Sequence, residues 1–286
     1  MEPRKPHPVS RRDFIRLGAA GAAALCAARF APFAAAADRK KIPVGLQLYS
    51  IRDDCDKDLP ATLEVVAKTG YVGVEFAGYY GRNAKDLRKL LDSNGLKCCG
   101  THTGVDTLLG DNLKKTVEFH QALGNKFLIC PGLPGEYTNS IAAWRKTADL
   151  FNEIAEKAKA DGMRVGYHNH SQEFKAVDGQ VPWDVFFSNT KPEVVMQLDT
   201  GNAMGGGADP VAILKKYPRR AGTIHLKEHG GSGDFGDGKC PFKEIFELCE
   251  AAGGTEWYII EQETYKYPPL QCVKQCMEFM KKMGKA

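Results

Sequence analysis

The chain has 286 residues, with 39 basic and 35 acidic side chains and a formal net charge of +4. Residues 1–37 carry six of the basic and two of the acidic side chains, so residues 38–286 hold 33 of each and are neutral overall. A neutral body of about 250 residues suits one domain and gives no support for binding to nucleic acid or to a membrane surface.

The N-terminal segment has the pattern of a bacterial twin-arginine export signal. Arg11 and Arg12 precede a mild apolar run, Leu17–Ala28, and Ala35–Ala37 offers a small-residue cleavage site. The apolar run is shorter than the roughly 20 residues that a membrane span needs, which argues against the alternative of a permanent anchor. We expect residues 1–37 to be removed and the rest of the chain to act in the periplasm or outside the cell, without membrane attachment.

Strand-like and helical runs alternate from residue 43 onward. Short apolar runs typical of strands fall at 43–50, 73–77, 96–103, 126–132, 163–170, 194–202, 221–228 and 257–263. Amphipathic runs typical of helices follow them at 59–70, 84–95, 111–124, 140–162, 181–190, 209–218, 241–253 and 269–284. Eight such units predict a single α/β domain, a (β/α)8 TIM barrel over residues 38–286. A doubly wound open sheet is the alternative, but no G-x-G-x-x-G pattern follows the first strand.

Polar residues gather where the predicted strands end. In a (β/α)8 barrel these carboxyl ends form one mouth, and active sites lie there. The residues at or just beyond the strand ends are Gln47, Tyr49, Glu75, His102, His168, His170, Glu173, Asp199, Asn202, His225, Lys227, Glu228, Glu261 and Glu263. Charged groups at such positions must be paired, solvated or bound to a metal, so their number indicates a site and not an ordinary core.

Four of these residues form a candidate metal site. His168, Asp199, His225 and Glu261 are separated by 31, 26 and 36 residues, which places them on the neighbouring strands five to eight. Imidazole and carboxylate ligands together suit one divalent ion of Mn, Co, Zn or Fe(II) better than Mg or Ca. The structural alternative is a set of buried ion pairs that stabilises the top of the barrel.

The same residues lie in motifs that resemble the xylose-isomerase-like TIM-barrel superfamily, which includes the sugar phosphate isomerase/epimerase family. The motifs are Gly45–Ser50, Gly73–Phe76, Tyr167–His170, Leu198–Asn202, Ile224–Lys227 and Ile260–Glu261. In ketose epimerases of this superfamily, Glu, Asp, His and Glu from strands five to eight hold one metal ion, and the two glutamates act as acid and base. Three residues match this set, Asp199, His225 and Glu261, while His168 stands in place of the first glutamate.

The resemblance and the chemistry of the side chains together imply catalytic roles. Glu261 is the first candidate for proton transfer, and His168 or His170 would serve the opposite face of a substrate. Lys227 lies two residues after His225 and would stabilise a developing oxyanion. The alternative for Lys227 is an ordinary solvated lysine at a strand end.

The remaining candidates are expected to contact the substrate. Glu173 resembles the acid that contacts the sugar in the epimerases, and reaching the metal is its alternative role. Asn202 stands where those epimerases have a substrate-binding histidine. His102 and Glu75 are expected in the pocket wall, with a purely structural role as the alternative.

These features predict a metal-dependent isomerase or epimerase that acts on a small carbohydrate or a sugar derivative. It would move a proton next to a carbonyl through a metal-stabilised enediolate. One alternative is a lyase, dehydratase or hydratase acting on keto sugars of the 3-keto-glycoside or inosose type, and another is a non-catalytic sugar-binding barrel. The neutral mature chain opposes a DNA repair nuclease, and the sequence leaves the oligomeric state open, a homo-oligomer included.

Overall fold

The structure is a computed structural model that describes residues 41–286. The expected export signal and its cleavage site, residues 1–37, lie outside the described residues. Among the helices of residues 41–286, none combines the length and the apolar character that crossing a bilayer requires.

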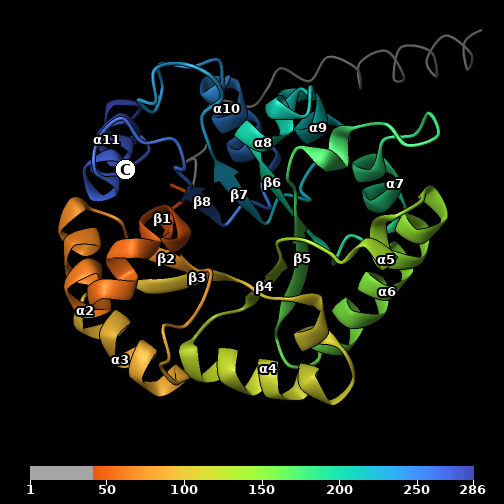
Figure 1. Ribbon diagram of the computed structural model, residues 1–286, viewed down its shortest axis with the longest axis horizontal. Helices are drawn as coiled ribbons and strands as arrows, with labels where there is room; N and C mark the ends of the chain where they lie inside the picture. Colours follow the sequence, from red (N-terminus) through yellow and green to blue (C-terminus); the bar gives the residue numbers. More distant parts are fainter. Residues whose placement is uncertain (1–40) are drawn as a thin grey trace, which may run out of the picture. The chain divides into compact units, whose positions relative to one another are not determined.

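Eight parallel strands close into a barrel in the described part of the chain. Each strand is hydrogen-bonded to the next in sequence, and β8 pairs with β1. The strands are β1 Val44–Gln47, β2 Gly73–Phe76, β3 Lys97–His102, β4 Phe127–Cys130, β5 Arg164–His168, β6 Val195–Asp199, β7 Thr223–Leu226 and β8 Trp257–Ile260. Figure 1 shows them at the centre of a ring of helices. The predicted (β/α)8 TIM barrel is therefore confirmed.

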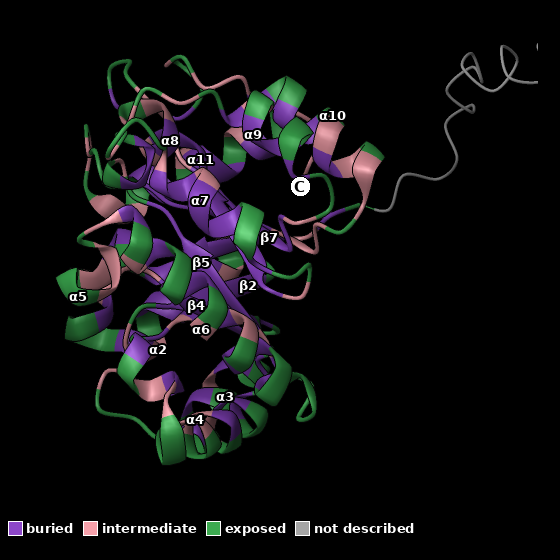
Figure 2. Cartoon of the chain, turned by 90° about the vertical axis from the view of Figure 1, so that its right-hand side faces the viewer, coloured by how far each residue is buried: buried purple, intermediate pink, exposed green. Residues whose placement is uncertain are grey.

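Helices and short 3-10 turns connect the strands around the outside. They are η1 Leu48–Ile51, α2 Arg52–Thr69, α3 Ala84–Ser93, η2 Val105–Leu108, α4 Gly110–Leu123, α5 Gly135–Thr138, α6 Ile141–Lys159, η3 Gln172–Phe174, α7 Pro182–Asn189, α8 Thr200–Gly205, α9 Pro210–Lys216, α10 Phe242–Ala252 and α11 Pro269–Lys282. Figure 2 shows buried residues on the faces toward the strands and exposed residues on the outer faces. Helix α6 buries Trp144, Ala148 and Phe151, whose spacing of three or four residues places them on one face.

Several strands end earlier than predicted, because the residues at their ends begin tight turns. The Oε1 atom of Gln47 accepts a hydrogen bond from the backbone N–H of Tyr49 at 3.0 Å, which starts η1. The Oδ1 atom of Asp199 accepts one from the backbone N–H of Asn202 at 2.6 Å, which caps α8. As a result Asn202 lies on a helix, and His170 lies in the turn after β5, although both were predicted to lie in strands.

The strand register brings polar residues side by side within the barrel. Gln47 pairs with Glu75 across β1 and β2, and Asp199 pairs with His225 across β6 and β7. A shift in register after Val74 places Glu75 opposite Gly100 of β3. A Cβ atom at Gly100 would lie 2.3 Å from Glu75 Oε1. The glycine therefore leaves room for a carboxylate inside the barrel.

Gly166 lies where neighbouring strands of the barrel pack closely, so a substitution there tests this packing. A Cβ atom at Gly166 in β5 would lie 2.5 Å from the backbone oxygen of Val195 and 2.8 Å from Ile129 Cδ1. We expect Gly166→Ala to lower the free energy of unfolding by about 1–3 kcal/mol, because the neighbouring strands must move apart. Urea denaturation measures the change. Gly132→Ala is the matched control, since its Cβ would have no neighbour within 4 Å among the described residues, and equal stability of the two variants would contradict the prediction.

Candidate functional site

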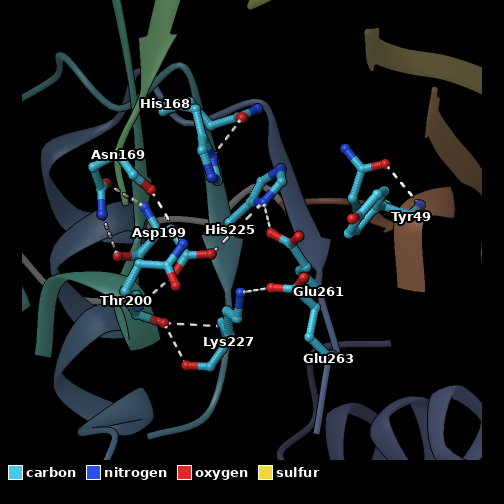
Figure 3. Close-up of polar contacts among 12 residues, drawn as sticks. Tyr49, His168, Asn169, Asp199, Thr200, His225, Lys227, Glu261 and Glu263 are labelled. Carbon is cyan, nitrogen blue, oxygen red and sulfur yellow. Dashed lines mark hydrogen bonds and ion pairs between the residues drawn. The ribbon is translucent and has the colours of Figure 1, made fainter. Parts of the chain in front are cut away.

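The last four strands bring four ligand-type side chains to one place. These are His168, Asp199, His225 and Glu261, which we call the donor quartet. One ligand atom from each lies within 4.8 Å of the other three, and all four side chains are buried. Figure 3 shows them pointing toward one another from β5, β6, β7 and the residue after β8. The prediction that these residues converge at the barrel mouth agrees with this arrangement.

His225 lies between two carboxylates. Its Nε2 atom is 2.5 Å from Glu75 Oε2, and its Nδ1 atom is 2.7 Å from Glu261 Oε2. Burial alone would lower the pKa of His225, but the charge of Glu75 and the hydrogen bonds to both carboxylates raise it to about 10. Without a metal ion, His225 is therefore an imidazolium that bridges Glu75 and Glu261.

Asp199 has an oxygen atom without a partner. Its Oδ2 atom is buried and makes no hydrogen bond to any residue in 41–286, and the nearest cationic group, His225 Nδ1, is 4.0 Å away. Burial is the main cause that raises the pKa of Asp199 to about 8; the cation of Lys227 opposes this rise, and the charge of Glu261 adds to it. A buried carboxylate oxygen without a partner is costly, so a bound cation at this point would relieve it.

His168 completes the quartet as a neutral imidazole. Its Nδ1 atom lies 3.1 Å from Gln197 Oε1. Burial, followed by the proximity of the His225 imidazolium and of His102, holds the pKa of His168 well below its usual value. The quartet thus offers two imidazoles and two carboxylates, a donor set that fits one divalent ion of the first transition row.

Glu75 differs from its predicted role in the pocket wall. It is fully buried, and its Oε2 atom accepts a hydrogen bond from Gln47 Nε2 at 2.9 Å besides contacting His225. Its Oε1 atom accepts one from Gln197 Nε2 at 2.9 Å. Because both oxygens are engaged below the mouth, Glu75 cannot contact a substrate there. It instead orients His225 so that Nδ1 faces Glu261, as carboxylates commonly do behind metal-binding histidines.

His102 lies at the end of β3, beside this buried network. Its Nε2 atom is 2.9 Å from Gln197 Oε1 and 3.3 Å from Glu75 Oε2, and its ring stacks on His225 with centroids 5.3 Å apart. The same side chain lines a cavity of about 370 Å³ together with Tyr79. No member of the quartet lines that cavity, so the place of His102 in a substrate pocket stays a prediction, and the structure shows it in the network behind the quartet.

Gln197 is not among the predicted site residues. It lies two residues before Asp199 in a strand that is otherwise apolar, and strand geometry places such residues on the same face. That position is the sequence signal that could have identified it.

Lys227 and Glu263 form an ion pair just beyond the ends of β7 and β8 (Figure 3). Burial lowers the pKa of Lys227, but the charges of Asp199 and Glu261 and its contact with Glu263 raise it above the usual value. Lys227 therefore stays cationic beside the quartet, which agrees with its expected role toward an oxyanion. Thr200 fixes its backbone, since Oγ1 accepts from the Lys227 N–H at 3.0 Å and donates to its carbonyl at 2.8 Å.

The turn after β5 places the remaining candidates. His170 is exposed, with its ring centroid 5.2 Å from that of His168. Asn202 is half-buried and donates to the backbone oxygen of Asn169 at 3.2 Å. Glu173 differs from its predicted contact with substrate or metal. It is buried, and its two oxygens accept from the Tyr167 hydroxyl and the His170 N–H, each at 2.8 Å, so it stabilises the turn.

Comparisons with known proteins agree with the barrel fold. The family described as "Xylose isomerase-like TIM barrel" matches residues 63–283. Inosose dehydratases from Serratia proteamaculans and Klebsiella pneumoniae are each 27% identical, over 246 and 242 residues, with 69% of this chain and 80% of each relative covered. A solved structure of a sugar phosphate isomerase/epimerase from Parabacteroides distasonis is 26% identical with a TM-score of 0.75, and the match covers 86% of this chain and 98% of that one.

The protonation of the quartet gives a test of metal binding. At pH 7 the metal-free protein holds a proton on Asp199, with a pKa of about 8, and one on His225, with a pKa of about 10. A metal ion must displace both protons, so we expect about two to be released per Zn²⁺ bound at pH 7 and about one at pH 9. Metal affinity accordingly rises as the pH rises. Calorimetric titration in buffers of different ionisation enthalpy counts the protons, and binding at pH 7 without proton release would contradict this assignment.

Proposed function

We propose a function from the premise that this chain belongs to the xylose isomerase-like TIM barrel family, as its match over residues 63–283 establishes. The chain is an enzyme that acts on a sugar or a sugar derivative. It isomerises or epimerises that substrate by moving a proton on a carbon next to a carbonyl group, with the help of one divalent metal ion.

One observation carries this proposal above the others. The buried Oδ2 atom of Asp199, unpartnered within residues 41–286, lies in a quartet of metal-ligand atoms at the mouth of the barrel. In a barrel that is stabilised by ion pairs alone, an uncompensated carboxylate oxygen would only lower the stability of the fold. A sugar-binding protein without catalytic activity has no need for it either, since neutral hydroxyl groups are bound without such a charge.

The quartet would hold the ion through His168, Asp199, His225 and Glu261. When bound, the ion supplies a Lewis acid that polarises a carbonyl or hydroxyl oxygen of the sugar. His168 would use its one lone pair as a ligand, so proton transfer falls to His170 and to Glu261, whose carboxylate has a second oxygen besides the one that would hold the ion.

Glu261 is the residue that removes the proton. It lies directly after β8 and is 5% exposed. Burial alone would raise the pKa of Glu261, but the hydrogen bond and charge of His225 hold it well below its usual value, so it is an anion at neutral pH. Lys227 stays charged and stabilises the negative charge that proton loss leaves on the substrate oxygen. His170, exposed beside His168, would return a proton to the other face of the substrate.

A dehydratase is the second candidate, and the similarity to the two inosose dehydratases favours it. The first step would be the same removal of a proton by Glu261. The two reactions differ in their second step, because a dehydratase then expels a hydroxyl group from the neighbouring carbon as water. An isomerase or epimerase instead returns the proton to carbon.

Solvent deuterium separates the candidates. We expect the Mn²⁺- or Co²⁺-loaded protein to exchange a carbon-bound proton of a ketose, a 3-keto glycoside or an inosose with D₂O, as followed by NMR. If deuterium enters a product that otherwise has the mass of the substrate, the reaction is an isomerisation or an epimerisation. If the product is lighter than the substrate by one water molecule, the protein is a dehydratase. Glu261→Gln should slow either reaction by at least about 100-fold, because it removes the base.

Glu247→Gln is the matched control for this substitution, since Glu247 lies on the exposed side of α10. It should exchange at the wild-type rate. If neither exchange nor turnover occurs with any tested metal and substrate, the protein is not such an enzyme.

We also propose that the protein acts after export in a folded state. The eight cysteines of residues 41–286 are free thiols and seven of them are buried, so the folded barrel shields them from an oxidising compartment. Replacing Arg11 and Arg12 by lysine should keep the full-length chain in the cytoplasm of a bacterial host. Cell fractionation measures this, and unchanged export of the double variant would contradict the twin-arginine route.

A further inference from the structure

Gln197 lies at the centre of the polar network behind the quartet. It is fully buried in β6, and its amide contacts four groups from four other strands. Its Nε2 atom donates to Glu75 Oε1 and to Thr223 Oγ1, each at 2.9 Å. Its Oε1 atom lies 2.9 Å from His102 Nε2 and 3.1 Å from His168 Nδ1. Gln197 therefore links His168, one member of the quartet, to Glu75, the carboxylate that orients His225, another member.

The orientation of the Gln197 amide is determined by Glu75. The Oε2 atom of Glu75 accepts a hydrogen bond from Gln47 Nε2 at 2.9 Å and lies 2.5 Å from Nε2 of the His225 imidazolium, so this carboxylate accepts hydrogen bonds and donates none. The opposite amide orientation would place two acceptor oxygens 2.9 Å apart. The NH₂ group must therefore face Glu75, and the amide oxygen must face the two imidazoles.

This orientation determines which nitrogen of each imidazole carries the hydrogen. An amide oxygen accepts hydrogen bonds and cannot donate them, so both contacting nitrogens must be N–H groups. A neutral imidazole has one N–H and one lone pair. In neutral His168 the hydrogen is then on Nδ1 and the lone pair is on Nε2.

The same reasoning separates His168 from His102. His102, His168 and His225 also lie within metal-binding distance of one another. However, the Nε2 atom of His102 donates to Gln197, and its lone pair is on Nδ1. His168 contacts Gln197 through the other ring nitrogen, and Figure 3 shows its ring extending toward Asp199 and His225. The two histidines thus have opposite tautomers although they share one acceptor.

We propose that Gln197 is a positioning residue that holds His168 in the Nδ1–H tautomer and so presents its Nε2 lone pair to the metal ion. Glutamine suits this position because one edge of its amide donates and the other accepts. A glutamate would put a second negative charge beside Glu75, and an apolar residue would leave the imidazole free to rotate or to change tautomer. This inference rests on the proposed metal centre, but the tautomer itself exists without the metal.

Nitrogen-15 NMR of the metal-free protein tests the tautomer directly. Long-range ¹H–¹⁵N correlation spectra distinguish the two neutral forms of a histidine, and His168→Gln identifies the signals of His168. We expect the Nδ1–H form of His168 in the wild type and its loss in Gln197→Met. Thr223→Val is the matched control, because it removes a partner of the amide NH₂ group and leaves the amide oxygen in place. An Nε2–H form of His168 in the wild type would overturn the proposal, even if Gln197→Met does not fold.

Zinc affinity, measured by competition with a chelator, gives the second readout. We expect Gln197→Met to weaken Zn²⁺ binding by about 10–100-fold and Thr223→Val to change it by less than about threefold. If Gln197→Met keeps both the wild-type affinity and the His168 tautomer, the positioning role is wrong while the metal centre stands. If the wild type shows the expected tautomer but binds no metal, the proposed metal-dependent function fails.

Discussion

Uncompensated negative charge, buried at the carboxyl end of the barrel, is the constraint on which the rest of this structure depends. Glu75, Asp199 and Glu261 are almost entirely removed from solvent. Against these three carboxylates stand the His225 imidazolium and Lys227, and Lys227 is also paired with Glu263. Burying carboxylates in this excess is costly unless a further cation is present. The proposed metal ion supplies that cation, and the proton on Asp199 takes its place in the metal-free protein.

The barrel makes this concentration of charge geometrically achievable. Each strand–helix unit returns the chain to the same mouth, so residues more than 25 positions apart in sequence meet within a few ångströms. Room for the carboxylates comes from small residues such as Gly100, which lies beside Glu75. Amide side chains of Gln47 and Gln197 then satisfy the oxygens that face away from the quartet. The network behind the ligands is thus as much a product of the fold as the ligands themselves.

The sequence predicts the barrel and the convergence of the quartet because both follow from periodic patterns. Alternating apolar runs specify the strands. Consecutive members of the quartet are separated by about one strand–helix unit in the sequence, which places them on neighbouring strands. The local turns are less accessible, since they depend on single hydrogen bonds such as that from Asn202 to Asp199. Glu75 and Glu173 look like pocket residues in the sequence, yet their partners fix them in the interior. A carboxylate at a strand end reveals its charge but not the direction in which it points.

The central claim is that the quartet binds one divalent ion. Anomalous diffraction from crystals of the mature protein grown with Zn²⁺ or Co²⁺ tests this most directly. The predicted result is a single strong peak surrounded by His168 Nε2, Asp199 Oδ2, His225 Nδ1 and a carboxylate oxygen of Glu261. A peak at another place, or a quartet in which His225 still bridges Glu75 and Glu261 at saturating metal, would contradict the claim.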